Sequence, residues 1–202
     1  LDAAETARSF TPDGWLITGD VGFIDTQGRL HLSGRAKDLI IRGGHNIDPK
    51  VIEDALGAHL AVALCAAVGA PDAYAGELPV AFATLKPGSP VTEAELLAFT
   101  AERVDEGPAK PKSITVLSAM PVTNVGKIYK PELRTLATAA VVRGLIQGVM
   151  VPLQTPAAQW PQVQATGDAP VVVDARDTPA AAWNMLKPLL DALPVKLVLH
   201  AP

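Results

Sequence analysis

The stretch Arg42–Leu60, "RGGHNIDPKVIEDALGAHL", decides the fold, because it joins a glycine turn directly to a helix. Asp48 is a residue type that caps helices, and Pro49 suits the first helical position because its φ is already helical. The apolar residues that follow recur at helical spacing and form one face; they are Val51, Ile52, Ala55, Leu56 and Leu60. The stretch therefore predicts an amphipathic helix that starts at Pro49.

The residues before this helix predict short strands. "WLITGD" (15–20) and "GFIDTQGRLHLSGR" (22–35) are expected to form short strands joined by turns, and "DTQGR" supplies a hairpin turn through Gly28. We expect a β-rich opening to the chain.

The residues after the helix continue the alternation of strands and helices. "AVALCAAVGA" (61–70) and "LPVAFATLKPG" (78–88) predict two paired strands. Thr92 and Glu95 have capping-box spacing at the start of a helix over 92–104, and "SITVLSAMP" (113–121) predicts another strand. The order βαββαβ over about residues 22–120 predicts an α+β fold in which a sheet is packed with helices.

The last third of the chain predicts a smaller unit. A helix over 131–150 leads out of the sheet region, and a Pro-rich connection follows at 151–162. The segments "APVVVDARD", "TPAAAWNMLKPLLDAL" and "VKLVLH" then predict a strand, a helix and a strand. We expect three regions: the end of an amino-terminal domain with a linking β-hairpin at 1–34, a central domain at 35–138 and a C-terminal extension at 139–202.

Composition excludes several classes of protein. A net charge of −4 and a pI near 5.5 give no basic surface for nucleic acid. Cys65, the single cysteine, has no partner for an internal disulfide, and its apolar surroundings indicate a buried thiol. The four histidines lack metal-ligand spacing, and no apolar run is long enough to span a membrane. Without a signal peptide we expect a cytoplasmic protein, and the opening at Leu1 reads as a fragment of a longer chain.

Five segments in one order resemble the carboxy-terminal motifs of acyl-CoA synthetases, within the adenylate-forming superfamily. They are "GWLITGD", "GFIDTQGRLHL", "GRAKDLIIRGGHNIDPKVIEDAL", "VGAPDAYAGELPVAFATLKPG" and "PVTNVGKIYKPEL", and they span about residues 13–136. In that family a carboxylate attacks ATP to give an acyl-adenylate, and the thiol of CoA then displaces AMP. The resemblance implies a small carboxy-terminal domain that rotates on a hinge between the two steps.

The resemblance implies a nucleotide-binding role for two residues of the opening segment. Asp20 of "TGD" matches the carboxylate that binds the ribose hydroxyls, and Arg35 matches a residue on the ribose or phosphate side of the nucleotide. Lys37 matches the hinge position. The alternatives are a turn aspartate for Asp20 and ordinary surface charges for Arg35 and Lys37.

A second set of residues matches the loop that faces CoA in the family. Gly43, Gly44 and His45, with Asn46 and Ile47, occupy the place that lines the pantetheine tunnel during thioester formation. Glycines there allow close approach of the backbone to a thin ligand and permit positive φ. A plain β-turn is the alternative reading of the glycine pair.

Lys127 matches the catalytic lysine of the family. In the family pattern the lysine of "P-x-T-x-x-G-K" contacts the carboxylate substrate and the α-phosphate, where negative charge builds during adenylation. The alternative is a solvated loop lysine, and we expect Lys130 to be a surface or phosphate-adjacent residue.

The function that follows is that of the carboxy-terminal part of an ATP-dependent acid:CoA ligase, inactive as an isolated fragment. ATP, CoA and Mg²⁺ are the implied cofactors, with Mg²⁺ bound mainly through the amino-terminal domain. The implied partners are that domain and a carboxylic acid, with no nucleic acid and no membrane span. Two alternatives are an adenylation domain that loads a carrier protein, and a non-catalytic α+β binding module.

Overall fold

The computed structural model describes residues 2–202 and forms two compact units, one ending at Leu39 and the other running from Ile40 to Pro202. The first unit is built around an antiparallel hairpin in which Asp20 lies opposite Arg35. Its elements are α1 (Ala3–Arg8), β1 (Asp20–Ile24), β2 (Leu30–Arg35) and the 3₁₀ helix η1 (Ala36–Asp38). The predicted hairpin through Gly28 is confirmed. The predicted strand over 15–20 is wrong, because only an isolated bridge between Phe10 and Leu16 forms there before β1 begins.

The described part of the first unit, residues 2–39, buries none of its side chains. Its large apolar residues are instead exposed; they include Trp15, Leu16, Ile17, Phe23, Ile24, Leu30 and Leu32. A hairpin with so little buried surface is at best marginally stable by itself in water. The apolar side chains of this segment are therefore open to solvent in the described structure.

The second unit contains a five-stranded sheet. Its strands are β3 (Ile40–Arg42), β4 (His45–Ile47), β5 (Val62–Asp72), β6 (Gly76–Leu85) and β7 (Ile114–Val116). The order is β4-β3-β6-β5, and β7 pairs in parallel with β6. The predicted pairing of the segments 61–70 and 78–88 is confirmed by the antiparallel register of β5 and β6.

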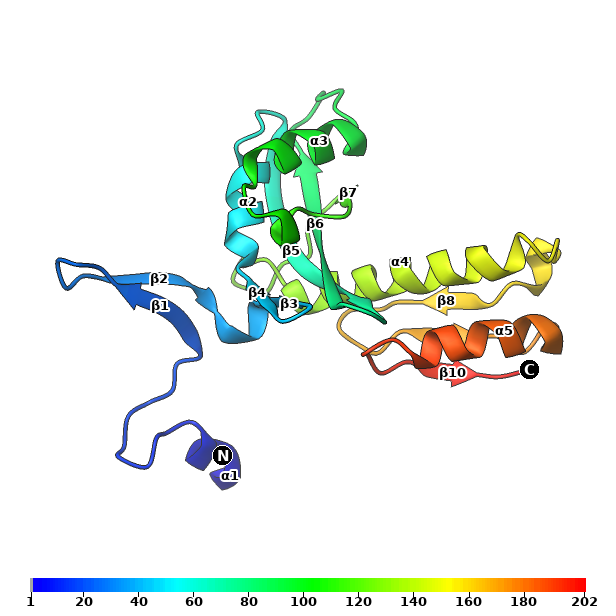
Figure 1. Cartoon of the computed structure of the whole chain (residues 1–202), viewed down its shortest axis with the longest axis horizontal. Coiled ribbons are helices and arrows are strands. Elements are labelled where there is room, and N and C mark those ends of the chain that lie inside the picture. Colours follow the sequence, from blue (N-terminus) through cyan, green and yellow to red (C-terminus); the bar gives the residue numbers. More distant parts are fainter. Residues whose placement is uncertain (1) are drawn as a thin grey trace. The chain divides into compact units, whose positions relative to one another are not determined.

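Helices cover both faces of this sheet, because side chains of β5 and β6 alternate between two cores. Ala67, Ala81 and Ala83 pack with Ile52, Leu56 and Leu96 of the helices α2 (Pro49–Gly57) and α3 (Glu93–Arg103). Val68, Val80 and Phe82 pack with Leu133 and Ala137 of the long helix α4 (Lys130–Met150). Figure 1 shows α2 and α3 beside the long strands β5 and β6. The predicted α+β class is confirmed.

Local signals predicted the starts of α2 and α3 well. Asp48 caps α2 by accepting the Lys50 N–H, and Thr92 and Glu95 form the reciprocal capping box of α3. The predicted apolar face of α2 was too wide. The helix ends at Gly57, and Val51 and Leu60 are 46% and 87% exposed.

The tail of the second unit packs against the far half of α4. Its elements are the 3₁₀ helix η3 (Ala157–Gln159), β8 (Gln162–Gln164), β9 (Val172–Asp174), α5 (Ala180–Asp191) and β10 (Val198–His200). The strands form a sheet of order β10-β9-β8, in which β9 and β10 are parallel. Val142 and Ile146 of α4 share a core with Trp183 and Leu186 of α5. Figure 1 shows α5 running alongside α4. The predicted strand, helix and strand are present, and β8 was missed.

None of the helices among residues 2–202 combines the length and the hydropathy that a membrane span requires.

Candidate functional site

The first unit brings together the two residues predicted to bind nucleotide. Asp20 and Arg35 are cross-strand partners in the hairpin, and Arg35 Nε lies 3.2 Å from Asp20 Oδ1. Asp20 begins β1 directly after Gly19, whose φ of +73° favours glycine. Both side chains remain partly exposed, so a carboxylate and a planar guanidinium are presented next to each other.

A second carboxylate, Asp25, organises the turn of the same hairpin. It accepts hydrogen bonds from the backbone N–H groups of Gln27 and Arg29 and from the side chains of Arg29 and His31. The hydrogen bond from His31 is the largest cause that lowers the pKa of Asp25 to about 2, and the N–H of Arg29 adds to it. Sequence reasoning identified the turn from Gly28 and missed this network. The spacing of Asp25 and Arg29 in the turn and of His31 in β2 was the available signal.

Lys37 lies in η1, two residues before Leu39, the last residue of the first unit. Its side chain is exposed and has a partner. The position predicted as a hinge is therefore close to the boundary between the two compact units.

Gly43 and Gly44 form the turn of the β3–β4 hairpin. Their φ angles are +54° and +87°, and a Cβ added at either position would meet no atom within 4 Å. The conformation, and not crowding, is what requires glycine there. His45 pairs with Arg42 and belongs to β4 together with Asn46 and Ile47, so the predicted loop is in fact a two-residue turn between strands.

Two hydrogen bonds to other parts of the second unit hold this glycine hairpin, one from the turn residue Gly43 and one from Arg42 at its base. The Gly43 N–H donates to the Ala75 carbonyl at 2.7 Å, in the turn between β5 and β6. Arg42 Nη1 donates to the Pro108 carbonyl at 2.6 Å, in the 3₁₀ helix η2 (Gly107–Ala109). The turn itself thus presents exposed backbone on an anchored base.

Lys127 lies near the tip of a short loop that is closed on itself. The Thr123 N–H donates to the Lys127 carbonyl at 2.7 Å, and the Lys127 N–H donates to Thr123 Oγ1 at 3.2 Å. Gly126, with φ of +78°, makes the reversal. The Lys127 side chain is exposed, and within residues 2–202 no carboxylate lies within the 4.0 Å of its ammonium that an ion pair requires.

Lys130 differs from Lys127 in its surroundings. Its Nζ lies 2.7 Å from Glu53 Oε1, and the two side chains are only 19% and 24% exposed. The expectation of a surface lysine is wrong, because the ammonium is paired with a carboxylate of α2. The phosphate-adjacent alternative stays a prediction. Sequence reasoning missed Glu53, since the two residues are distant in the chain.

Cys65 lies in β5, next to Glu53 of α2, and is partly buried. Its thiol donates to the Glu53 carbonyl at 3.3 Å. Burial, and secondarily the negative charge of Glu53, raises the pKa of Cys65 to about 11. The thiol is therefore protonated at neutral pH, which fits the predicted structural role and not that of a nucleophile.

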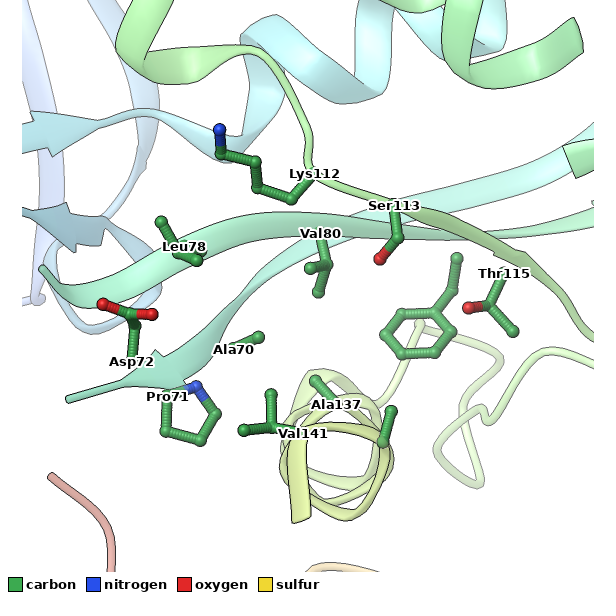
Figure 2. Close-up of a pocket in the computed structure, with 12 residues that line it drawn as sticks. Ala70, Pro71, Asp72, Leu78, Val80, Lys112, Ser113, Thr115, Ala137 and Val141 are labelled. Atoms are coloured by element: carbon green, nitrogen blue, oxygen red, sulfur yellow. The ribbon is translucent and has the colours of Figure 1, made fainter. Parts of the chain in front are cut away.

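A separate cavity of about 290 Å³ lies between the β5–β6 pair and α4 (Figure 2). Val80, Ser113 and Thr115 line its sheet side, and Ala137 and Val141 of α4 face them from the other side. None of the residues predicted for the functional site lines it. Among residues 2–202, no group of three or more His, Cys, Asp and Glu side chains is arranged to hold a metal ion.

Comparison with known proteins identifies the family. The family described as "AMP-binding enzyme C-terminal domain" matches residues 51–127, which run from α2 to the exposed lysine. The chain contains an AMP-binding enzyme C-terminal domain. The resemblance to adenylate-forming enzymes is thereby confirmed at the level of the family.

Relatives and solved structures agree with this identification of an AMP-binding enzyme C-terminal domain. The chain is 49% identical over 142 residues to a marinolic acid–CoA ligase of a Pseudoalteromonas species. It is 43% identical over 130 residues to a long-chain-fatty-acid–CoA ligase of Bacillus subtilis. The crystal structure of ATP-bound MatB from Rhodopseudomonas palustris matches 66% of this chain and 26% of its own, with 34% identity and a TM-score of 0.62.

The matched part is a small share of each relative. The Pseudoalteromonas match covers 70% of this chain and 22% of that ligase, and the Bacillus match covers 64% and 23%. The chain thus spans about a quarter of the length of the curated relatives it matches. Those relatives are CoA ligases by name.

Proposed function

We propose that this chain is the carboxy-terminal part of an ATP-dependent acid:CoA ligase and supplies one residue set to each of its two half-reactions. The observation that carries the proposal is the state of Lys127. Its ammonium is exposed near the tip of a closed loop and is not neutralised by any carboxylate of residues 2–202. A cation presented in this way is available to anions that come from outside the unit.

In the first half-reaction a carboxylate oxygen of the acid attacks the α-phosphorus of ATP. The new O–P bond gives the acyl-adenylate, and pyrophosphate leaves with the electrons of the broken P–O bond. Two anions approach each other in this step, and charge accumulates on the phosphoryl oxygens. The Lys127 ammonium neutralises part of both charges and so lowers the barrier.

In the second half-reaction the sulfur of CoA attacks the acyl carbonyl, the thiol loses its proton, and AMP leaves. The thin pantetheine arm needs close approach of backbone, which side chains at the turn would block. Gly43 and Gly44 provide such a surface, since nothing lies within 4 Å of either missing Cβ. His45 lies beside the turn in β4, and we assign it to the same CoA-facing surface.

The remaining site residues belong to nucleotide binding and to the hinge. Asp20 accepts hydrogen bonds from the ribose hydroxyls, and Arg35, which lies 3.2 Å from it, binds on the phosphate side. Lys37 lies at the proposed hinge, on which the carboxy-terminal domain rotates between the two half-reactions. The partner is the amino-terminal domain of the same protein, which the exposed apolar residues of the first unit support.

Mg²⁺, when bound, offsets the charge of the ATP phosphates. The described residues show no carboxylate cluster for it, so no step above depends on it. Its binding through the amino-terminal domain and the cytoplasmic location stay predictions.

The test measures the two half-reactions separately in the full-length protein. ATP–pyrophosphate exchange reports adenylation, and conversion of supplied acyl-adenylate with CoA reports thioester formation. Lys127→Ala should lower exchange by about 10²- to 10³-fold and leave thioester formation largely intact. Gly44→Leu, which forces a side chain into φ of +87°, should do the reverse.

Two controls match these variants. Lys110→Ala removes another exposed lysine, and Gly88→Leu adds the same side chain at a glycine with φ of +76° and open surroundings. Both should leave both reactions unchanged. Full activity of Lys127→Ala in both assays would contradict the proposal and favour a non-catalytic binding module. Transfer of the acyl group to a carrier protein but not to CoA would favour the carrier-loading alternative.

A further inference from the structure

The loop that carries Lys127 behaves as one body because its two limbs are hydrogen-bonded to each other. Val122 and Ile128 form an antiparallel bridge, and the Tyr129 N–H donates to the Pro121 carbonyl at 2.9 Å. Together with the bonds between Thr123 and Lys127, these contacts leave little internal freedom in the loop. The position of the Lys127 backbone, from which the side chain extends, is therefore set where the limbs join the rest of the unit.

Lys130 fixes this junction from the domain side. It is the first residue of α4, and its ammonium lies 2.7 Å from Glu53 Oε1 in a mostly buried setting. The same carboxylate oxygen accepts the Ala67 N–H of β5 at 2.9 Å. Glu53 thus ties the start of α4 to α2 and to the edge of the sheet through one charged group.

Tyr129 fixes the junction from the tail side. Its hydroxyl donates to Asp168 Oδ2 at 2.6 Å, and Asp168 precedes β9 in the C-terminal extension. This hydrogen bond to the carboxylate raises the pKa of Tyr129, so the phenol remains protonated and a donor. The extension therefore contacts the limb of the loop two residues after Lys127.

We propose that Lys130 and Tyr129 are positioning residues for Lys127, held by Glu53 in the domain and by Asp168 in the C-terminal extension. The inference rests on the proposed function, because it assigns these residues to the adenylation step. It also gives the extension a part in that step through Asp168. Neither residue needs to touch a substrate.

The physical reason is the sensitivity of charge stabilisation to distance. An ammonium that is misplaced by about 1 Å can cost about 10²-fold in rate, even when the change lies away from the reacting atoms. Lys127 is on a loop with no other charged anchor of its own among residues 2–202. Two anchors on adjacent residues restrict both the translation and the rotation of the loop.

The experiment uses the full-length protein and the two half-reaction assays. Lys130→Met removes the charge and keeps most of the side-chain length, and Glu53→Gln keeps an acceptor for the Ala67 N–H but loses the anion. Each should lower the kcat of pyrophosphate exchange by about 10- to 100-fold with the KM for ATP nearly unchanged. Thioester formation from supplied acyl-adenylate should persist. Lys130→Arg should restore most of the exchange.

A double-mutant cycle separates positioning from general loss of structure. The double variant Lys130→Met with Glu53→Gln should be no slower than either single variant, because both remove the same interaction. Lys50→Met is the matched control, since Lys50 forms a 2.8 Å ion pair with Asp54 on the exposed side of α2. It should leave both reactions unchanged.

The second anchor, the hydrogen bond between Tyr129 and Asp168, is tested with the same assays, and the expected effects are smaller. Tyr129→Phe and Asp168→Asn should each lower exchange by roughly 3- to 10-fold, without adding to each other, as expected for one solvent-exposed hydrogen bond. Tyr74→Phe is the control, because the Tyr74 side chain is fully exposed. Its loss of a hydroxyl should have no effect.

The outcomes divide clearly. If Lys127→Ala abolishes exchange but Lys130→Met and Tyr129→Phe do not change it, the positioning role is wrong and the proposed function stands. If both half-reactions fall together and Lys130→Arg fails to rescue, the ion pair is structural only, which also overturns the inference. If Lys127→Ala itself retains exchange, the proposed function fails first.

Discussion

The two candidate half-sites of the second unit are built on opposite principles. The Lys127 loop presents a charged side chain, and its base is held by the charged pair of Lys130 and Glu53. The glycine hairpin at Gly43 and Gly44 presents bare backbone, and hydrogen bonds to backbone carbonyls hold its base. One should therefore fail when a side chain is removed, and the other when a side chain is added.

The largest expected effect comes from a substitution in the core beneath α4, because this core supports the Lys127 loop and not the glycine hairpin. Leu133 is fully buried one turn after Lys130, and Leu133→Ala should cost about 2–5 kcal/mol of local stability through the lost contacts and the cavity left behind. Faster amide hydrogen exchange along α4 in the full-length protein measures it. Adenylation should fall more than thioester formation, because the Lys127 loop leads directly into α4.

Leu189→Ala is the matched control for that experiment, because Leu189 lies on α5 with 42% of its surface exposed. It should cost roughly 1 kcal/mol or less. An equal loss of both half-reactions in Leu133→Ala would mean that the two half-sites do not depend on separate supports.

The next effect concerns the base of the glycine hairpin. Arg42→Met removes the 2.6 Å hydrogen bond to the Pro108 carbonyl, a charge-assisted bond worth about 1.5–3 kcal/mol. Thioester formation from supplied acyl-adenylate should fall by about 10- to 100-fold, and pyrophosphate exchange should not change.

Arg103→Met provides the comparison for Arg42→Met. Arg103 also donates to a backbone carbonyl, that of Phe99 at 3.0 Å, but within the exposed surface of α3. It should leave both reactions unaffected. Loss of exchange in Arg42→Met would show that the hairpin base also serves the adenylation step.

The alkylation rate of Cys65 should change less, and it reports on the base of the Lys127 loop because the thiol contacts Glu53, the partner of Lys130. With its pKa raised from 9.0 to about 11, its thiolate fraction at pH 8 is roughly 10- to 100-fold below that of an ordinary cysteine, and alkylation should be slowed accordingly. Mass spectrometry of the Cys65 peptide measures the rate. Lys130→Met should accelerate it by loosening α2 from β5, whereas Arg42→Met should not.

The sequence predicts those elements of the fold whose stabilising interactions lie close together in the chain. The cap at Asp48 and the capping box of Thr92 and Glu95 act within four residues, and both were predicted from the residue types at those positions. The strand β8 was missed because Gln162–Gln164 is polar and short, and only its pairing with β9 makes it a strand.

The candidate site divides in the same way. The residues at the tips, Lys127 and the glycine pair, could be proposed because a motif with fixed spacing carries them. The anchors could not, since Glu53 meets Lys130, and Asp168 meets Tyr129, only after the chain has folded. Their residue types alone resemble ordinary surface charges. Interactions between distant segments are thus the part that needed the structure.

The smallest effect at neutral pH is expected from Asp25 in the first unit. This carboxylate supports the turn of the β1–β2 hairpin, which carries none of the residues assigned to catalysis. The pKa of Asp25 is lowered from 3.8 to about 2, first by the hydrogen bond from His31 and then by the N–H of Arg29. A lowered folded-state pKa means that the stabilisation is fully present above about pH 4 and is lost as the pH falls through about 2. The charge of Asp25 should therefore not change between pH 5 and pH 8. The NMR amide shifts of Gln27 and Arg29, which donate to Asp25, should titrate with a midpoint near 2. Asp25→Asn should abolish that titration, and a midpoint near 3.8 in the unmodified protein would mean that the network does not form in solution.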